Sequence, residues 1–216
     1  MYNKNMKIIR LDEVNSTHIY LKELISKNGY EEAICILSDY QTQGIGSRGN
    51  SWTGVKGNMF FSFVIKRDLL PIDLPLQSVS IYVSFILKNM LKTQGSQIWL
   101  KWPNDFYLAD KKIGGTITTL SKDLIYCGIG INLLNVSDDF GKLDIQIDKE
   151  ELLKKYFTCI EQKISWKQIF SDFRIDFQLS KKFQTTIDNQ KVSLENAILN
   201  EDGSIQVNNK KVFSLR

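Results

Sequence analysis

The chain has 216 residues, of which 43% are hydrophobic and 24% charged. This composition is typical of a globular domain with a sizeable core and excludes an intrinsically disordered chain. The formal net charge of +4 is compatible with an anionic substrate but too small to indicate nucleic-acid binding by itself. The sequence shows neither a signal-peptide pattern nor an apolar run of membrane-spanning length, so we expect a cytoplasmic protein without membrane association.

The predicted elements begin with a strand at residues 7–11 and a helix that starts after the cap-forming residues Ser16 and Thr17 and ends at Gly29. A glycine-rich stretch at residues 39–52 then separates two apolar strands. The apolar spacing predicts these further elements in order: strands at 33–37 and 58–65, a helix at 76–91, strands at 97–102, 106–109, 113–120 and 124–133, and two helices within 150–179.

Around Ser180 the pattern changes to short strands at 192–199, 204–207 and 212–215. Turn-forming Asn, Asp and Gly residues separate these strands. A β unit of this size is too small to be stable alone, so we expect it to pack on the main domain. The three cysteines lie far apart, and with one histidine in the chain they predict free buried thiols instead of a zinc site or a disulfide.

The glycine-rich stretch contains Gly44, Gly46 and Gly49 in the G-x-G-x-x-G spacing of a dinucleotide fingerprint. No helical pattern follows these glycines, and the fingerprint requires one, so we do not interpret it as a nicotinamide or flavin site. Exposed backbone N–H groups in such loops bind anions, and Arg48 adds a fixed cation. A glycine-rich surface turn without a ligand is the alternative.

A second unusual stretch is the run Lys-Trp-Pro-Asn-Asp at residues 101–105. Pro103 breaks a strand ladder, so the chain should bend there and present the polar groups that follow. The carboxylate of Asp105 beside cations is one way to hold Mg²⁺ together with substrate phosphates. Lys112 follows, next to the glycines at 114–115, which allow close approach. The alternative is a surface turn with solvated lysines.

A third stretch, residues 127–133, alternates glycine with apolar residues and ends near Asn132. Glycines inside a strand usually mark a position where another group packs against the backbone.

Together and in this order, these three stretches resemble the biotin protein ligase family, in its monofunctional form without an N-terminal DNA-binding domain. The resemblance implies an α+β catalytic domain at residues 1–180. Its class II synthetase-like fold would have a central mixed or antiparallel sheet with helices on one side. A small SH3-like β domain at residues 181–216 would follow. It also implies a two-step reaction in which biotin and ATP form biotinyl-AMP, with Mg²⁺. The biotinyl group then passes to a lysine of a biotin carboxyl carrier domain.

By the same resemblance, each site residue acquires an expected role. The expected biotin contacts are Ser16, Thr17, His18, Gln41, Gly44, Gly46, Lys112, Gly114, Gly115, Gly128 and Gly130. The expected ATP contacts are Arg48, Gly49, Trp52, Lys101, Asn104, Asp105 and Asn132. The expected catalytic residues are Lys112, Arg48, Lys101 and Asp105, with Asp105 also the metal ligand.

The sequence departs from the family pattern at two places. His18 stands where the family usually has asparagine, and it is either an ordinary helix-start residue or a biotin contact. Ile45 and Ser47 replace two arginines of the usual loop. We therefore expect biotinyl-AMP to be held less tightly than in typical members, because each lost charge-assisted contact costs about 1.5–3 kcal/mol.

Two other functions stay open from the sequence: a lipoate or octanoate protein ligase, and a biotin-binding sensor without catalysis. The catalytic pattern starts within the first ten residues. We therefore expect no helix-turn-helix of the kind many relatives carry, and no specific DNA binding. The sequence leaves a monomer and a homodimer equally open.

Overall fold

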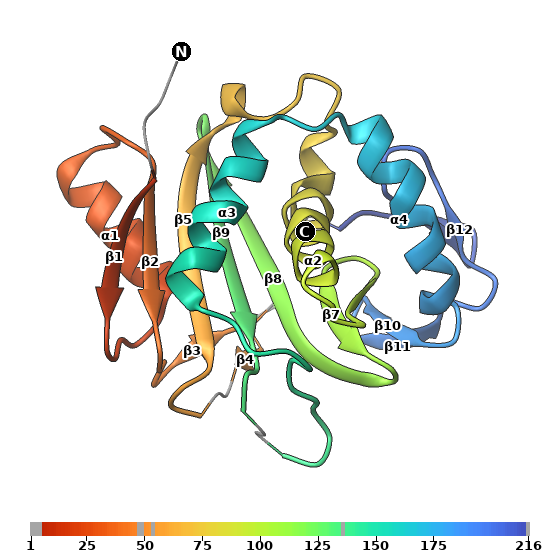
Figure 1. The fold of residues 1–216 in the computed structure, drawn as a ribbon. Helices are drawn as coiled ribbons and strands as arrows, with labels where there is room; N and C mark the ends of the chain where they lie inside the picture. The colour runs from red at the N-terminus through yellow and green to blue at the C-terminus, as the bar shows by residue number, and fades with distance from the viewer. Residues whose placement is uncertain (1–5, 47–49, 53–54, 135–136, 215–216) are drawn as a thin grey trace.

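The computed structural model describes residues 6–46, 50–52, 55–134 and 137–214. Its centre is a seven-stranded mixed sheet with the strand order β1-β2-β5-β9-β8-β7-β6 (Figure 1). The strands are β1 (Lys7–Leu11), β2 (Ile34–Ser38), β5 (Met59–Lys66), β6 (Trp99–Lys101), β7 (Asp105–Leu108), β8 (Lys111–Ser121) and β9 (Leu124–Ile131). β1 and β2 are parallel, and all other neighbours are antiparallel. The mixed sheet confirms the predicted fold class.

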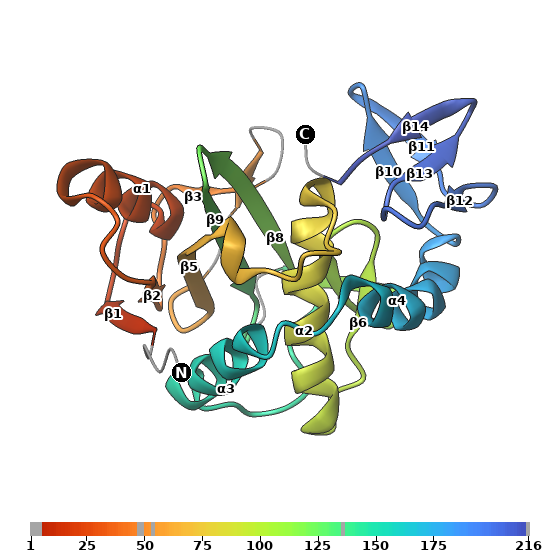
Figure 2. The same cartoon turned by 90° about the horizontal axis from the view of Figure 1, so that it is seen from above.

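The four helices are α1 (Thr17–Asn28), α2 (Val79–Thr93), α3 (Lys149–Glu161) and α4 (Trp166–Ser180). Ser16 caps α1, and Gly29 ends it with φ +79°, as the sequence predicts. Figure 2 shows α1 on one face of the sheet and α2 and α3 on the other. The expectation of helices on one side therefore describes the larger helical layer, and α1 forms a smaller layer opposite it.

The main core lies between the sheet and the larger helical layer. α2 is apolar on nearly all sides, and most of its residues are buried, as expected for a helix in the middle of a domain. Phe61 and Phe63 of β5 pack edge-on against Tyr156 of α3. The Tyr156 hydroxyl donates a 3.0 Å hydrogen bond to the Val83 carbonyl, so the buried phenol has a partner.

The C-terminal strands differ from the prediction in their bounds. They are β10 (Gln184–Ile187), β11 (Gln190–Ser193), β12 (Ile198–Leu199), β13 (Ile205–Val207) and β14 (Lys210–Val212). The strand expected at 192–199 is split, because Leu194 and Ala197 turn inward and are fully buried. The strand expected at 212–215 instead lies at Lys210–Val212, and β10 was not predicted because its polar and β-branched residues give no clear apolar alternation.

These strands form a two-stranded and a three-stranded antiparallel sheet beyond α4, far from α1 (Figure 2). Asn208 and Asn209, with φ +48° and +60°, connect β13 to β14. Two consecutive positive-φ residues are typical of a type I′ hairpin, as the Asn-Asn pair predicts. Residues 1–180 and 181–216 as separate domains stay a prediction.

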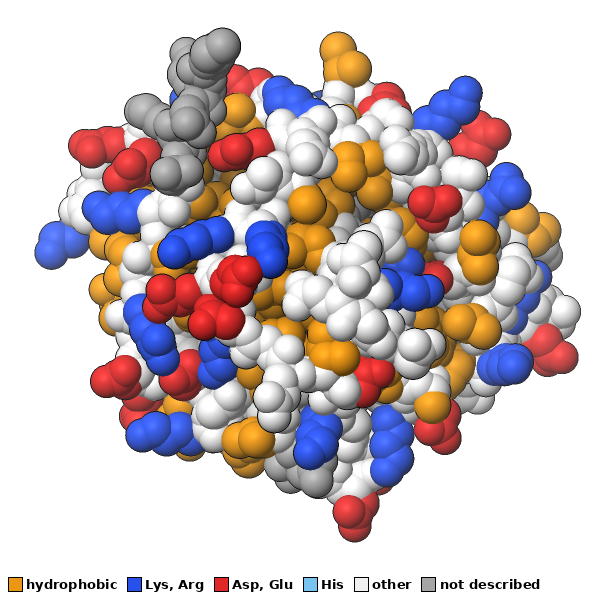
Figure 3. Space-filling model, in the orientation of Figure 1, with side chains coloured by type: hydrophobic (Ala, Val, Ile, Leu, Met, Phe, Trp, Pro, Cys, Tyr) orange, Lys and Arg blue, Asp and Glu red, His pale blue; other side chains and the backbone are white. Residues whose placement is uncertain are grey.

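The surface of the face that carries α2 and α3 shows lysine and arginine side chains interspersed with acidic ones (Figure 3). This mixing agrees with the small net charge of +4. Among the described residues, no helix combines the length and apolar character needed to cross a bilayer. All three cysteines are free thiols.

Candidate functional site

Two short segments of the glycine-rich stretch pair as strands, although the sequence pattern predicts no strand between residues 39 and 52. β3 (Gly44–Ile45) pairs antiparallel with β4 (Ser51–Trp52). A Cβ at Gly44 would lie 2.4 Å from the Trp52 carbonyl oxygen, so only glycine permits this pairing without a shift. The pairing places the Trp52 ring beside the sheet, and its buried Nε1 has no hydrogen-bond partner among the described residues.

A polar cluster forms at the start of α1, where Thr17 meets Gln41 and Ser62. The backbone N–H and the hydroxyl of Thr17 both donate to Oε1 of Gln41, at 2.7 and 2.9 Å. The Thr17 hydroxyl also lies 2.8 Å from Oγ of Ser62. Ser16, Thr17 and Ser62 are almost fully buried. The predicted residues Ser16, Thr17 and Gln41 therefore lie together.

His18 belongs to the same cluster and is only 6% exposed. Its Nε2 lies 3.2 Å from Oγ1 of Thr119 on β8, and its buried Nδ1 has no partner in the part of the chain that the structure describes. Burial, together with the nearby ammonium of Lys22, lowers the pKa of His18 to about 4, because a desolvated imidazole resists protonation. The ring is therefore neutral at neutral pH.

A cationic cluster lies at the other end of the site. Nζ of Lys112 lies 2.6 Å from Oδ1 of Asp105, and Nζ of Lys101 lies 3.7 Å from Oδ2. Burial would raise the pKa of Asp105, but the two ammonium groups outweigh it and lower that pKa. Burial lowers the pKa of Lys101, with the carboxylate opposing it. Two cations share one anion, so the cluster carries a net positive charge that suits an anionic ligand.

The glycines of β8 and β9 leave the space above the backbone free of side chains between these two clusters. A Cβ at Gly128 would lie 3.1 Å from Oγ of Ser62 and 3.2 Å from Nδ1 of His18. A Cβ at Gly130 would lie 3.1 Å from Nε1 of Trp52, and one at Gly115 would lie 3.2 Å from Oδ1 of Asp105. The prediction that other groups pack against these glycines is confirmed.

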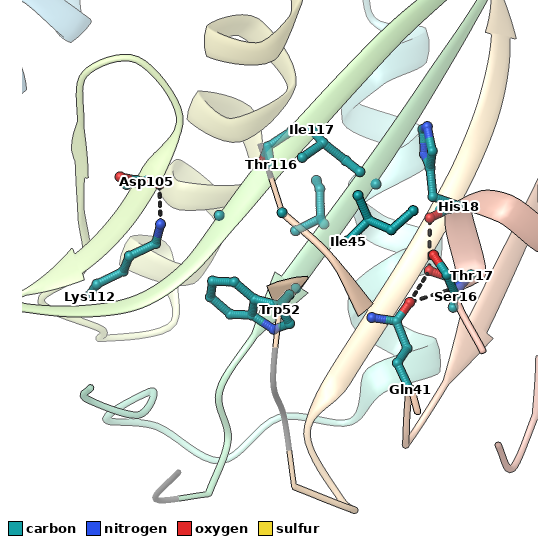
Figure 4. Close-up of a pocket in the computed structure, with 16 residues that line it drawn as sticks. Ser16, Thr17, His18, Gln41, Ile45, Trp52, Asp105, Lys112, Thr116 and Ile117 are labelled. Atoms are coloured by element: carbon teal, nitrogen blue, oxygen red, sulfur yellow. Dashed lines mark hydrogen bonds and ion pairs between the residues drawn. The ribbon is translucent and has the colours of Figure 1, made fainter. Parts of the chain in front are cut away.

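Both clusters line one cavity. Figure 4 shows Ser16, Thr17, His18 and Gln41 on one side of it and Lys112 with Asp105 on the other. Between them lie Trp52, Ile45 and Ile117. This cavity of about 50 Å³ adjoins a larger one of about 570 Å³ that shares His18, Asp105 and Lys112. Residues 184–186 and Lys191 of the C-terminal sheets line the larger cavity.

The larger cavity also contains Lys101 and Asn104 of the 101–105 run. The Trp102–Pro103 peptide in this run is cis. The Asn104 side chain donates to the Thr116 carbonyl, and the Asn104 carbonyl accepts from the Thr116 backbone N–H at 3.0 Å. This run therefore forms a rigid turn against β8 and is not a loose surface loop.

Not every predicted residue reaches these cavities. Asn132 is 1% exposed, accepts from Asn58 at 3.3 Å and donates to the Gly141 carbonyl at 3.2 Å. Neither cavity includes Asn132, Gly44 or Gly114 in its lining. Arg48 and Gly49 lie outside the described residues, so their expected contacts with ATP and the catalytic role of Arg48 stay predictions.

Sequence reasoning missed several residues of the site. The missed lining residues on the central sheet include Ser62, Thr116, Ile117, Thr118, Thr119 and Ile129. One signal existed for Ser62, which is the polar interruption in the otherwise apolar run at 59–65. A buried polar residue in such a strand needs partners, and this one faces Thr17.

The described residues do not form a metal site by themselves. Within residues 6–46, 50–52, 55–134 and 137–214, no three His, Cys, Asp or Glu side chains come together. Both oxygens of Asp105 already face ammonium groups. Asp105 as a magnesium ligand stays a prediction, and the present arrangement does not fit a metal held by the protein alone.

Comparison with known proteins gives a consistent result. Residues 11–132 match the biotin/lipoate A/B protein ligase family. The chain is 32% identical over 168 residues to biotin–protein ligase 2 of Arabidopsis thaliana, which covers 68% of this chain and 50% of that protein. It is 29% identical over 173 residues to the bifunctional ligase/repressor BirA of Bacillus spizizenii, covering 72% and 53%. The chain therefore spans about half the length of these relatives.

A solved structure extends the similarity over the whole chain. Biotin acetyl coenzyme A carboxylase synthetase from Helicobacter pylori, with bound biotinylated ATP, is 38% identical to this chain. The superposition has a TM-score of 0.91 and covers 96% of this chain and 99% of that one. The similarity therefore includes the C-terminal sheets as well as residues 11–132.

Proposed function

This chain belongs to the biotin/lipoate A/B protein ligase family, and we propose that it is an ATP-dependent biotin protein ligase. In the first step the biotin carboxylate attacks the α-phosphate of ATP, forming biotinyl-AMP and releasing pyrophosphate. In the second step a lysine amine of a carrier domain attacks the acyl carbon, which releases AMP and a proton. One observation carries this proposal: a single cavity joins a neutral polar end to a cationic end.

The two ends of the cavity match the two ends of biotin. Donor and acceptor groups of Ser16, Thr17 and Gln41 suit the ureido ring, which has one carbonyl and two N–H groups. The apolar side chains of Ile45 and Ile117 and the Trp52 ring line the middle, which suits the rest of the molecule. Lys112 lies at the far end, where the carboxylate would be.

Lys112 is placed to bring two anions together. Its Nζ is held 2.6 Å from Asp105 and lies 5.4 Å from the centroid of the Trp52 ring. When the acid enters, this ammonium can turn from Asp105 to the biotin carboxylate and offset its repulsion from the phosphate. Electrostatic stabilisation of this kind, with the reactants held in place, supplies much of the barrier reduction in such reactions.

The larger cavity is the proposed place for the nucleotide and the incoming lysine. Lys101, Asn104 and Asp105 line it from the central sheet, and residues 184–186 line it from the C-terminal sheets. Lys101 suits a phosphate group. The carboxylate of Asp105 suits the ammonium of an acceptor lysine before that lysine loses its proton. Arg48 in the loop is proposed to reach the phosphates as well.

The relatives support biotin over lipoate as the substrate, because one of the similar proteins above is named a biotin–protein ligase and another was solved with bound biotinylated ATP. Lys112 in the cavity favours an enzyme over a sensor that only binds. We further propose a biotin carboxyl carrier domain as the acceptor and the cytoplasm as the location. Both follow from the family, not from the geometry.

Pyrophosphate exchange tests the proposal. The protein is incubated with ATP, labelled pyrophosphate and either biotin or lipoate. Biotin-dependent label in ATP is the expected result, followed by transfer of biotin to a carrier domain but not to its Lys→Arg variant. Lipoate-dependent exchange would support the rival ligase. Biotin binding without exchange would support the sensor.

A further inference from the structure

The hydrogen-bond donors and acceptors at the polar end of the cavity can be assigned from the contacts. The backbone N–H of Thr17 can only donate, so the Gln41 atom that it meets at 2.7 Å is the carbonyl oxygen Oε1. The Thr17 hydroxyl gives its single proton to the same oxygen, at 2.9 Å. In its 2.8 Å contact with Ser62, the Thr17 hydroxyl must therefore accept. Ser62 thus uses its own proton on Thr17 and can only accept from the cavity.

The surroundings of His18 allow it to accept a hydrogen bond from the cavity as well. Its Nε2 faces Oγ1 of Thr119 at 3.2 Å, and its buried Nδ1 has no partner in the described chain. Ser62 and Gly128 are paired across β5 and β9. Oγ of Ser62 and Nδ1 of His18 therefore converge on the same bare stretch of backbone at Gly128, 3.1 and 3.2 Å from the position that a Cβ would take.

We propose that His18 is a specificity-determining residue, whose Nδ1 acts with Oγ of Ser62 to accept a hydrogen bond from an N–H of the bound ligand. The naming of that group as a ureido N–H of biotin rests on the proposed function. The arrangement requires the tautomer in which Nε2–H donates to Thr119 and Nδ1 keeps its lone pair. In the other tautomer Nδ1 carries the proton and becomes a donor. The ligand N–H would then face one acceptor, Oγ of Ser62, and one donor.

Burial supports this protonation state. It lowers the pKa of His18 to about 4, so the ring is neutral at neutral pH and one of its two nitrogens keeps a lone pair that can accept. A ligand without an N–H at this position would leave the buried Nδ1 of His18 without a partner, and unsatisfied buried groups are the strongest basis for discrimination between similar ligands. The site would therefore reject lipoate, whose ring carries no N–H, at the same place where it holds biotin.

The direct test is ¹⁵N NMR of the histidine ring in the unmodified protein. The chain contains a single histidine, so the two ring nitrogens can be assigned without ambiguity. Without ligand we expect a protonated Nε2 and an unprotonated Nδ1. Saturating biotin should move the Nδ1 resonance upfield, as a lone pair does on accepting a hydrogen bond, while Nε2 changes little. Lipoate should leave both resonances in place.

Variants measured by biotin titration give a second test. H18L removes the acceptor and should weaken biotin binding about 3- to 10-fold, as expected for one neutral hydrogen bond. H18N supplies an acceptor oxygen and should restore binding to within about two-fold. S62A should weaken binding by a similar factor. S80A removes a buried hydroxyl on α2 that lies outside the cavity and has no partner among the residues described, and should bind like the unmodified protein.

The outcomes separate the two proposals. Biotin binding with an unmoved Nδ1 resonance, or with full affinity in both H18L and S62A, would overturn the role of His18 and leave the ligase assignment standing. An upfield Nδ1 shift would support that role even if H18L does not fold. Absence of biotin binding by the unmodified protein would overturn the proposed function together with this inference.

Discussion

Nε1 of Trp102 donates a 2.9 Å hydrogen bond to the carbonyl of Gly203 and so joins the central sheet to the C-terminal sheets. Trp102 is fully buried and lies between Lys101 and the bend at Pro103. The same turn is held by Trp166, whose Nε1 donates to the Glu201 carbonyl at 2.8 Å. The strand that presents Lys101 is therefore also an anchor for the C-terminal sheets, whose residues line the larger cavity.

W102F should loosen the C-terminal sheets, because it removes the donor and leaves the Gly203 carbonyl buried without a partner. We expect a loss of about 1–3 kcal/mol in the free energy of unfolding, measured by urea denaturation. Hydrogen exchange should also become faster in residues 184–212. Y156F is the control, since it removes a donor to the Val83 carbonyl away from these sheets. Unchanged exchange in W102F would contradict the anchoring role.

A comparison of alanine variants at Gly203 and Gly29 tests how closely the turn at Gly203 packs on its neighbours. Their φ angles are +78° and +79°, but a Cβ at Gly203 would lie 2.4 Å from Oγ of Ser78, whereas nothing lies within 4 Å of one at Gly29. G29A should therefore destabilise by about 1–3 kcal/mol from backbone strain alone, because φ +79° with ψ 172° is a conformation that essentially only glycine adopts. G203A should destabilise by about 1–3 kcal/mol more, from overpacking. Equal losses in thermal or urea unfolding would show that the Gly203 turn does not dock closely.

K112Q should lower biotin-dependent pyrophosphate exchange, because it removes the ammonium proposed to meet the biotin carboxylate. A charge-assisted contact contributes about 1.5–3 kcal/mol, so we expect about a 10- to 100-fold fall in kcat/KM for biotin. K111Q changes the neighbouring lysine, whose Nζ binds the Asp138 carbonyl at an exposed position. It should stay within about two-fold of the unmodified enzyme. Similar losses in both variants would point to strand distortion instead of a charge effect.

The stability of the protein should fall as the pH is lowered from 6.5 toward 4, because of His18. Its pKa is about 4 in the folded chain and about 6.5 when unfolded. In this interval the unfolded chain binds a proton that the folded chain does not, so protonation favours unfolding. The full difference corresponds to about 3 kcal/mol.

Urea unfolding at several pH values measures this effect in the unmodified protein and in H18N. The difference between their free energies of unfolding should change with pH below 6.5 and stay constant above it. Parallel pH profiles below 6.5 would show that His18 is not buried as a neutral ring.

S47R should slow the release of biotinyl-AMP. Residues 47–49 lie outside the described part of the chain, so this prediction comes from the sequence, which lacks two loop arginines of the family pattern. One added charge-assisted contact would slow dissociation by about 10- to 100-fold. The measurement is the rate at which preformed biotinyl-AMP leaves the protein. A rate unchanged by S47R would contradict the expected weaker retention.

Much of the fold and the site followed from local patterns. Apolar spacing located the helices and most strands of the central sheet, and Ser16 and Gly29 marked the ends of α1. The residues that the family resemblance singled out include Lys112 and Asp105 at the cationic end of the cavity and Ser16, Thr17 and Gln41 at its polar end. Their roles toward biotin and ATP stay predictions. The helices and strands could be predicted because each depends on residues that are close in sequence.

The sequence by itself determined the helices, most strands of the central sheet and the family that the chain resembles. Only the tertiary structure decided that Ser62 lies opposite Gly128, that Nδ1 of His18 beside it has no partner among the described residues, and that the turn at Gly203 docks on Trp102. The reason is physical. Strand register and the packing of the C-terminal sheets bring together residues that are far apart in the chain. Both are fixed by how whole faces pack, and the local spacing of apolar residues does not contain this information.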